Sequence, residues 1–356
     1  MKAKFSGTGL VKADALEGRV RNKNTAADLA AVANFGLSSK TKETYQTSIN
    51  HIKKCQEDTG VDLTLPFDLD KTLEFIGWMR TKGLMGSSMS TYLSGVRMYH
   101  IAVGFNEPPL RQPLVKLILK GQGNIDMLRK KMSGDVGKLP VTVNMMKLIK
   151  LELGKVSWPM TEVRLFWAVA CLAWAGSFRV HELLSRSKTG VDPQTTLFWS
   201  DIKMGQTTIE GKNIKTLSIH VKSPKVERVG NGDNILVFEM GGFMCPIAAM
   251  RKYRDISGLR ENSDKAVFRH ADKTCFTGKE MNGQLKELTK EVTSMVKGGK
   301  VTSHSFRAGV ASEMARAGCT EEELMAVGRW SSRAYMDYIK LGISHRAALA
   351  MRVARG

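Results

Sequence analysis

The sequence predicts a mainly α-helical protein with a small antiparallel β-sheet, arranged as two domains. Apolar residues recur at helical spacing through most of the chain, and only three short runs between residues 196 and 240 read as strands. A charged segment with glycines at 131–140 separates the two parts. With 356 residues, of which 42% are hydrophobic, the chain is long enough to build two cores.

The amino-terminal part divides into an arm and a helical domain. Residues 1–37 show no clear period apart from an alanine-rich turn near 26–32, so we expect a flexible arm with one short helix there. Residues 38–130 read as short helices joined by loops, which predicts a compact all-α domain. The first helix places Tyr45, Ile49 and Ile52 on one face. The other helices are expected at 69–81, 87–103 and 113–120.

After a linker at 131–140, residues 141–356 are expected to form a second domain of mixed structure. Residues 161–175 are almost wholly apolar, which predicts a buried central helix that ends at Gly176. A three-stranded antiparallel sheet is expected, with a basic hairpin before its last strand. The strands are expected at 196–202, 215–222 and 234–240, and further helices at 246–253, 283–296 and 344–354.

Charge and cysteine content narrow the choice of partner and compartment. Lys and Arg total 54 against 34 Asp and Glu, a net charge of +20, which favours DNA or RNA over an anionic membrane. A basic protein without such a partner is the alternative. The five cysteines lack the spacing of a zinc site or a disulfide framework. No apolar run reaches membrane-spanning length, and the first residues lack the core of a signal peptide, so we expect an intracellular protein that does not enter membranes.

The segment 302–338 gathers side chains that are typical of a phosphate site. His304 and Arg307 are three residues apart, so they share one face of a helix, which Ser303 or Thr302 would cap. The amino end of a helix offers N–H groups and a positive dipole to an anion. An indole and tyrosine hydroxyls follow within the same segment. This combination indicates a site that binds a phosphate and attacks it.

Two short motifs, which we call the first and the second sequence box, resemble those of the tyrosine recombinase (phage integrase) family. They follow each other along this chain in the same order as in that family. The second reads His304-Ser-Phe-Arg307, then Gly328-Arg-Trp330, then Tyr338-Ile. The first is Gly176-Ser-Phe-Arg179-Val-His-Glu182-Leu, which matches the family's G-x-x-R-x-x-E-L pattern. The Phe-Arg and Gly-Arg-Trp variants are similar to DIRS-like and Crypton-like recombinases of eukaryotic mobile elements. The resemblance implies a helical core-binding domain and an α+β catalytic domain that form a C-shaped clamp on DNA.

The resemblance also implies a role for each matching residue. Tyr338 would be the nucleophile, Arg179 and Arg307 would hold the phosphate oxygens, and His304 and Trp330 would add donors. Lys222 would be the general acid on the hairpin, with Lys225 as its rival, and Glu182 would support the site. The interval from Trp330 to Tyr338 is one residue shorter than in typical phage-type members, which makes Tyr335 a competitor; we expect Tyr335 to be core.

Further expectations concern DNA contacts, assembly and cofactors. Guanidinium groups would take the role that metal ions play elsewhere, so neither a metal nor another cofactor is expected. Duplex DNA would be bound by a dimer on one site and a tetramer on two, with the tail helix packing on its own domain or exchanging between protomers. We expect the protein in the nucleus if its source is a eukaryote, and in the cytoplasm if its source is a prokaryote or a virus. The residues expected to contact DNA are Lys40, Lys42, Ser87, Ser88, Thr91, Arg97, Arg129, Lys130 and Lys131.

Two alternatives to a recombinase remain open at this stage. A topoisomerase-like enzyme would nick and reseal one duplex, whereas a recombinase would yield recombinant junctions. A domesticated DNA-binding protein would keep the fold without cutting DNA. Either enzyme would form a covalent protein–DNA product, and a domesticated DNA-binding protein would not.

Overall fold

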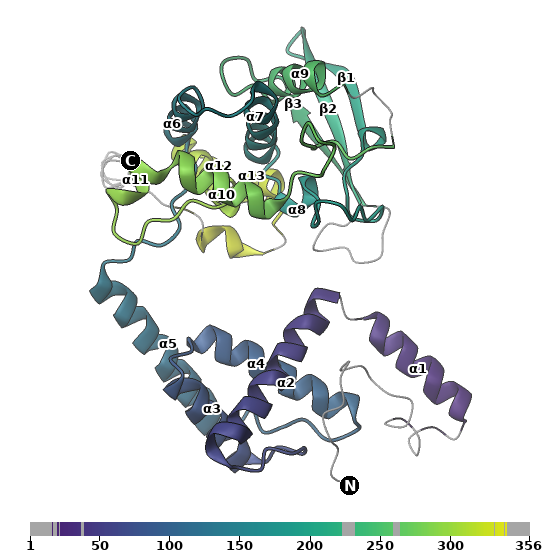
Figure 1. Ribbon diagram of the computed structural model, residues 1–356, viewed down its shortest axis with the longest axis vertical. Coiled ribbons are helices and arrows are strands. Elements are labelled where there is room, and N and C mark those ends of the chain that lie inside the picture. Colours follow the sequence, from purple (N-terminus) through teal and green to yellow (C-terminus); the bar gives the residue numbers. More distant parts are fainter. Residues whose placement is uncertain are drawn as a thin grey trace. The chain divides into compact units, whose positions relative to one another are not determined.

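Contacts divide the computed structural model into two compact units, residues 1–134 and 135–356 (Figure 1). The structure describes residues 16, 20, 22–36, 39–222, 232–258, 264–330, 332–337 and 339. The division falls inside the segment 131–140 that the sequence predicts as a linker, because the helix before it continues to Ser133. None of the helices in these described ranges is both long and apolar enough to span a membrane.

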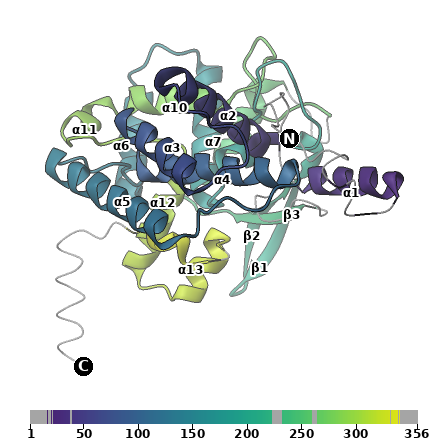
Figure 2. The same cartoon turned by 90° about the horizontal axis from the view of Figure 1, so that it is seen from below.

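The first unit is helical throughout its named elements. They are α1 (Lys23–Phe35), α2 (Ser39–Thr59), α3 (Leu69–Thr81), α4 (Gly86–Ala102) and α5 (Pro113–Ser133). Asp68 caps α3 by accepting a 2.8 Å hydrogen bond from the Lys71 amide. Helices α2 and α4 cross closely, since a Cβ on Gly95 would lie 2.1 Å from the Ser48 hydroxyl oxygen. Helices α2, α3 and α4 lie side by side (Figure 2), and Ile49 and Ile52 of α2 are buried in the apolar core that these helices share, as the spacing predicts.

The second unit combines helices with one small sheet. Its elements are α6 (Val143–Leu153), α7 (Met160–Ala175), α8 (Val180–Leu183), the 3₁₀ helix Trp199–Asp201, β1 (Ile202–Ile209), β2 (Lys212–Val221), β3 (Asp233–Phe238), α9 (Pro246–Ser257), α10 (Gly278–Leu288), α11 (Lys290–Ser294), α12 (His304–Ala317), α13 (Glu321–Gly328) and the 3₁₀ helix Arg333–Asp337. Helix α7 runs through the middle of this unit, between α6 and the sheet (Figure 1). All residues from Leu165 to Ala173 are buried, as its apolar sequence predicts.

The sheet has the order β1-β2-β3, and both pairs are antiparallel. Ile202 pairs with Ile219, and Leu217 pairs with Val237, so their apolar side chains share the face covered by α9. The prediction of a first strand at 196–202 is wrong, because the strand only begins at Ile202. The Asp201 carboxylate accepts a 2.7 Å hydrogen bond from the Phe198 amide, which closes a 3₁₀ turn where an extended segment was expected.

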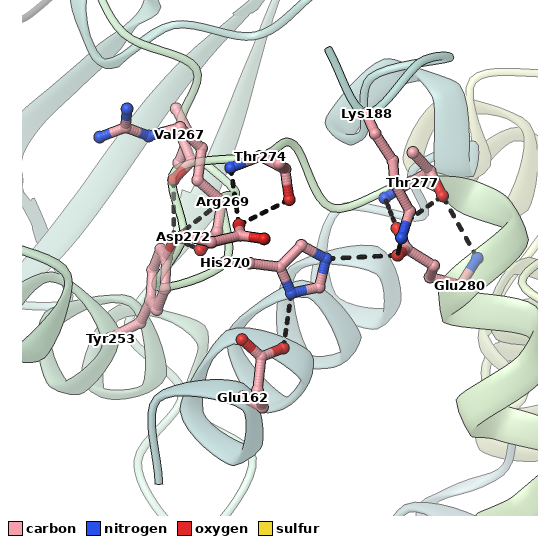
Figure 3. Close-up of polar contacts among 10 residues, drawn as sticks. All are labelled: Glu162, Lys188, Tyr253, Val267, Arg269, His270, Asp272, Thr274, Thr277 and Glu280. Carbon is pink, nitrogen blue, oxygen red and sulfur yellow. Dashed lines mark hydrogen bonds and ion pairs between the residues drawn. The ribbon is translucent and has the colours of Figure 1, made fainter. Parts of the chain in front are cut away.

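A polar network ties the loop before α10 to the rest of the second unit (Figure 3). His270 Nδ1 lies 2.7 Å from a carboxylate oxygen of Glu162 on α7. Glu280, in the first turn of α10, forms a 2.6 Å ion pair with Lys188. The Cys275 amide also donates to the Lys188 carbonyl at 2.8 Å. The segment that follows α8 is therefore held at two points, the side chain and the carbonyl of Lys188. These contacts fix the path of the chain where it leaves the first sequence box.

Candidate active site

The turn after α7 carries the first sequence box into the interior. Ser177 has a left-handed backbone (φ 47°), which is uncommon for a residue other than glycine. Gly176 before it is required for packing, since a Cβ there would lie 2.1 Å from the Phe178 ring. The sharp turn leaves the Ser177 carbonyl to accept hydrogen bonds from two guanidinium groups, those of Arg307 and Arg329.

Arg307 is the most deeply buried arginine of the site, with 2% of its surface exposed. Its Nη1 donates to the Ser177 carbonyl and its Nη2 donates to the Gly328 carbonyl at 2.7 Å. The guanidinium also lies over the Trp330 ring, 5.0 Å from the centroid. Burying a charge costs several kcal/mol unless dipoles or a counter-charge compensate it. The two carbonyls and the indole face provide such compensation and hold the cation in one orientation.

Glu182 joins two arginines that come from distant parts of the chain. Its Oε1 accepts from Arg179 Nη1 at 2.8 Å, and its Oε2 accepts from Arg329 Nη2 at 2.7 Å. Oε2 also accepts from the Arg179 backbone amide at 2.8 Å, which caps α8. Burial acts to raise the pKa of Glu182, but Arg329 and Arg179 outweigh it and lower the pKa. The carboxylate is therefore ionised, and the predicted supporting role of Glu182 has a clear geometric basis.

His304 begins α12 and stands among cations. Burial lowers the pKa of His304, and the charges of Lys138, His181, Arg307 and Arg179 lower it further. Its imidazole is therefore neutral at neutral pH. The expected side-chain cap by Ser303 or Thr302 is wrong in detail: Ser303 holds the cap position without such a bond, and the Ser305 hydroxyl accepts from the Thr302 amide at 3.0 Å.

Trp330 and Tyr335 lie in a small apolar cluster with Ala311 and Leu324. Trp330 is 8% exposed, and its ring centroid is 5.8 Å from that of Tyr335. The ring also fills the space beside Gly328, where a Cβ would lie 1.7 Å from it. The expectation that Tyr335 is a core residue agrees with this burial. Tyr338 lies outside the described residues, as does the tail helix expected at 344–354.

Lys222 directly follows β2 and is held by the segment before β1. Its Nζ forms a 2.7 Å ion pair with Asp201 and donates to the Thr196 carbonyl at 3.2 Å. It also lies 4.1 Å from the centroid of the Phe198 ring. Lys222, Glu182 and other residues line a small cavity of about 20 Å³, so the end of β2 adjoins the first sequence box. Lys225, the rival lysine, lies outside the described residues.

The residues expected to contact DNA from the first unit range from half-buried to exposed. Ser88 and Thr91 line a shallow hollow of about 220 Å³ between α2 and α4. Arg97 is paired with Glu107 at the surface. Ser87 is exposed, Lys42 is half-buried on α2, and the side chain of Lys40 lies outside the described part. The last three expected contacts, Arg129, Lys130 and Lys131, are exposed on the final turns of α5.

Sequence reasoning missed three side chains that the fold brings to this region. Arg329 and His181 both belong to the two sequence boxes, so the sequence itself could have indicated them as site residues. Lys138 comes from the segment predicted as a linker, whose amides and carbonyls pair with residues near Lys300. A linker assignment gives no reason to expect a site residue, and only the tertiary pairing places Lys138 near His304.

No family model matches the sequence, and no curated protein matches it. Solved structures do match in fold. The XerH site-specific recombinase, bound to a palindromic difH substrate in a post-cleavage complex, covers 97% of this chain and 90% of its own at 11% identity and a TM-score of 0.55. A lambda integrase dimer bound to a COC′ core site covers 88% of this chain and 77% of its own, at 14% identity and a TM-score of 0.55. The Tn1549 transposon integrase with a circular intermediate DNA covers 89% and 94%, at 14% identity and a TM-score of 0.54.

These similarities extend over most of the chain on both sides of each comparison. At 11–14% identity they establish the fold and not the chemistry. The protein has the tyrosine recombinase fold, mainly helical with one small antiparallel sheet.

Proposed function

We propose that this protein is a site-specific DNA recombinase that cuts and rejoins strands through a 3′-phosphotyrosyl intermediate. The observation that carries the proposal is that Arg179 is held by the Glu182 carboxylate, Arg307 is held by the Ser177 carbonyl 130 residues away, and both cations lie close enough to His304 to lower its pKa. A cluster of oriented cations around a neutral imidazole suits an anion whose charge grows during the reaction. The net charge of +20 suits a nucleic acid as the substrate.

The two arginines would bind the non-bridging oxygens of the scissile phosphate. Arg179 is held by Glu182 at 2.8 Å, and Arg307 is held by the Ser177 and Gly328 carbonyls. Because these contacts fix the cations before substrate arrives, little reorganisation is needed as the pentacoordinate state forms. Guanidinium groups bind phosphate bidentately, so they both orient and neutralise it.

Tyr338 would attack the phosphorus. A phenol has an ordinary pKa near 10, and cations beside it in the complex with DNA would favour its ionised form. The neutral imidazole of His304 can take the phenolic proton as the bond to phosphorus forms. Trp330 is buried under Arg307, so we propose that it supports that cation from behind. Lys222, the general acid implied by the resemblance, has its ammonium ion bound by Asp201.

Duplex DNA would be the partner, and the acting species would be a homo-oligomer, with a dimer on one site and a tetramer on two. The DNA contacts expected from the first unit would position the duplex through its phosphates. The similar lambda integrase structure is a dimer bound to DNA, which supports this assembly as a proposal.

The test is capture of the covalent intermediate. Purified full-length protein is incubated with a library of nicked duplexes of random sequence, and SDS-resistant protein–DNA complexes are recovered and sequenced. Wild type should yield a covalent complex on a defined set of sequences, and Tyr338→Phe should yield none. Tyr335→Phe is the matched control and should keep the activity, because Tyr335 is a buried packing residue.

Each other result points elsewhere. Absence of any complex with wild type would contradict catalysis and favour a silent DNA-binding protein. A complex that forms, but gives relaxed plasmid and no junctions between two sites, would favour the topoisomerase-like alternative. A complex lost in Tyr335→Phe and kept in Tyr338→Phe would move the nucleophile to Tyr335.

A further inference from the structure

We propose that a cavity between β1 and α9 is a docking site for a partner protein, and that it binds an extended segment of that partner in which apolar and acidic residues alternate. The cavity has a volume of about 330 Å³, and ligand sites typically span about 300–1,000 Å³. It shares no lining residue with the small cavity beside Lys222, so it is separate from the candidate active site. The inference therefore does not depend on the proposed DNA chemistry.

The cavity exists because α9 covers only part of one face of the sheet. Helix α9, at the end of the second unit opposite to α8 in Figure 1, packs mainly against β2 and β3. Met204 of β1 pairs with Leu217 of β2, so both side chains lie on that same face. Leu217 is 3% exposed, whereas Met204 is 50% exposed. The part of the face that β1 contributes is thus left open. The buried residues that line the hollow are Trp199, Ile202, Leu217, Ile247 and Met250.

The open side of the cavity adjoins the outer edge of the sheet. The strand order is β1-β2-β3, and within the described ranges no further strand pairs with the outer edge of β1. Residues 203–206 are exposed. A free edge offers backbone N–H and C=O groups to an extended chain. A strand added there would direct every second side chain onto the face that bears the cavity. This geometry favours an extended segment with apolar residues at alternate positions.

The rim of the cavity is cationic. Lys203 and Arg251 are exposed, and half-buried Arg254 lies 3.8 Å from the Met204 sulfur through its Nη1. Among the described residues that line the cavity there is no Asp or Glu. Such a rim attracts carboxylates. Phosphates of DNA could use the same cations, but they would leave the apolar floor unfilled. Arginine and methionine beside an apolar floor are typical of protein–protein interfaces, so a protein partner fits better.

The carboxyl-terminal segment of this chain has the wrong charge for the rim. Residues 340–356 include Lys340, Arg346, Arg352 and Arg355, and no Asp or Glu. Like charges placed together across an interface oppose binding. The rim therefore disfavours this segment, whether it comes from the same chain or from a second copy.

Selection from short random peptides displayed on phage tests the proposal. Full-length wild type is the bait, and an excess of non-specific duplex DNA occupies the DNA-binding surface. Enriched peptides should carry Asp or Glu together with large apolar residues at alternate positions. The most enriched sequence, made as a fluorescein-labelled peptide, should bind in fluorescence anisotropy. Joint reversal of two rim charges, Lys203→Glu with Arg251→Glu, should weaken its binding by about tenfold or more.

Matched variants separate the cavity from the general charge of the protein. Lys252→Glu reverses an exposed charge on α9 that does not line the cavity, and it should leave the affinity unchanged. Met204→Trp fills the open side without changing charge, and it should also weaken binding. Circular dichroism melting confirms that each variant is folded.

Methyl NMR of the methionines locates the bound peptide. The signals of Met204 and Met250, assigned by substitution with Leu, should shift when the peptide binds. The signal of Met295, which is 82% exposed and does not line the cavity, should not shift.

Every other result overturns the docking site. These results are no enrichment, enrichment of basic peptides, or equal binding by the rim variant and Lys252→Glu. A smaller salt dependence of DNA binding in the rim variant, with release of the peptide by duplex DNA, would assign the cavity to DNA. Tighter binding of a peptide with the sequence of residues 340–356 would assign it to the tail of a neighbouring copy. Capture of the covalent intermediate is a separate assay, so failure of this proposal and failure of the proposed function are distinguishable.

Discussion

The carboxylate of Glu182 and the guanidinium of Arg329 form a 2.7 Å ion pair between residues 147 positions apart. Through the same carboxylate, Arg329 is linked to Arg179. Arg329 itself has a left-handed backbone (φ 52°), and its guanidinium lies 5.3 Å from the centroid of the Phe178 ring. One buried anion thus joins the first sequence box to the segment that leads to the proposed nucleophile.

Glu182→Gln should destabilise the protein and abolish activity together. The substitution leaves two partly buried cations without their shared counter-charge, and breaking a buried pair typically costs about 3–5 kcal/mol. Urea denaturation would measure the free energy of unfolding. The matched control is Glu152→Gln, whose pair with Lys155 lies at the surface, where solvent screens it, and should contribute little to stability. Similar losses for the two variants would contradict the role of Glu182.

The pH profile of covalent-complex formation should report His304. Burial and nearby cations lower the pKa of His304 below its ordinary value of 6.5. A lowered pKa means that the ring stays neutral above pH 6.5 and becomes protonated only at lower pH. We therefore expect the rate to fall on the acid side through a midpoint below 6.5, and His304→Gln should lose this limb. A midpoint at or above 6.5 would show that the imidazole is not the group described.

Glu280 should make stability depend on pH in the acid range. Burial acts to raise the pKa of Glu280, but hydrogen bonds from Lys188 and Thr277 outweigh it and lower the pKa to about 2. Since the folded-state pKa is depressed, this stabilisation is complete above the unfolded value of about 4.5 and is lost as pH falls towards 2. Glu280→Gln should cost about 1 kcal/mol at pH 7, because solvent screens the exposed Lys188, and should flatten the unfolding free energy between pH 5 and pH 2. An unchanged slope in urea titrations would contradict this.

Gly328→Ala should destabilise the segment around Trp330. The added Cβ would lie 1.7 Å from the indole, so the ring or the helix end must move, at a cost of about 1–3 kcal/mol. Displacement of Trp330 also removes the aromatic face under Arg307. The control is Gly283→Ala on α10, where no atom lies within 4 Å, and where alanine should stabilise by about 0.5–1 kcal/mol. Thermal melting of both variants decides whether the two changes have opposite signs.

DNA binding should weaken steeply with salt. Each phosphate neutralised contributes about −0.9 to the slope of log K against log salt on duplex DNA. Replacing the exposed Arg129, Lys130 and Lys131 by Gln should reduce the magnitude of that slope by up to about 3. Lys82→Gln is the control, because Lys82 is engaged with Asp58 at 2.8 Å and should leave the slope unchanged. Fluorescence anisotropy across salt concentrations measures both, and a flat response in wild type would argue against a DNA clamp.

Local spacing and apolar content predicted much of this fold. The range 69–81 coincides with α3, and the apolar run 161–175 nearly coincides with α7, because in both cases helical period and burial agree. The start of β1 escaped prediction because most of its residues are exposed and polar, so pairing with β2 determines the strand. Helix α5 runs beyond the predicted 113–120 through glycines at 121 and 123, which intrinsic preference disfavours.

The sequence predicted a contact between two residues of the candidate site where both residues belong to one short motif. Arg179 and Glu182 are three residues apart and do meet, at 2.8 Å. The carbonyl of Ser177 could not be anticipated, since its role follows from a left-handed turn in a residue that rarely adopts one. Trp330 is both apolar and a donor, so its sequence position was compatible with a substrate contact or with the core. Its burial in the structure favours the second.

The cluster of Ala311, Leu324, Trp330 and Tyr335 is separate from the main core of its unit. Elements with few buried apolar neighbours open at a lower free energy than the core beside them. The described segment from Leu324 to Tyr335 therefore rests on this small cluster and on the polar contacts of Gly328 and Arg329, not on the main core. This part of the unit can open locally while α7 and the sheet stay folded.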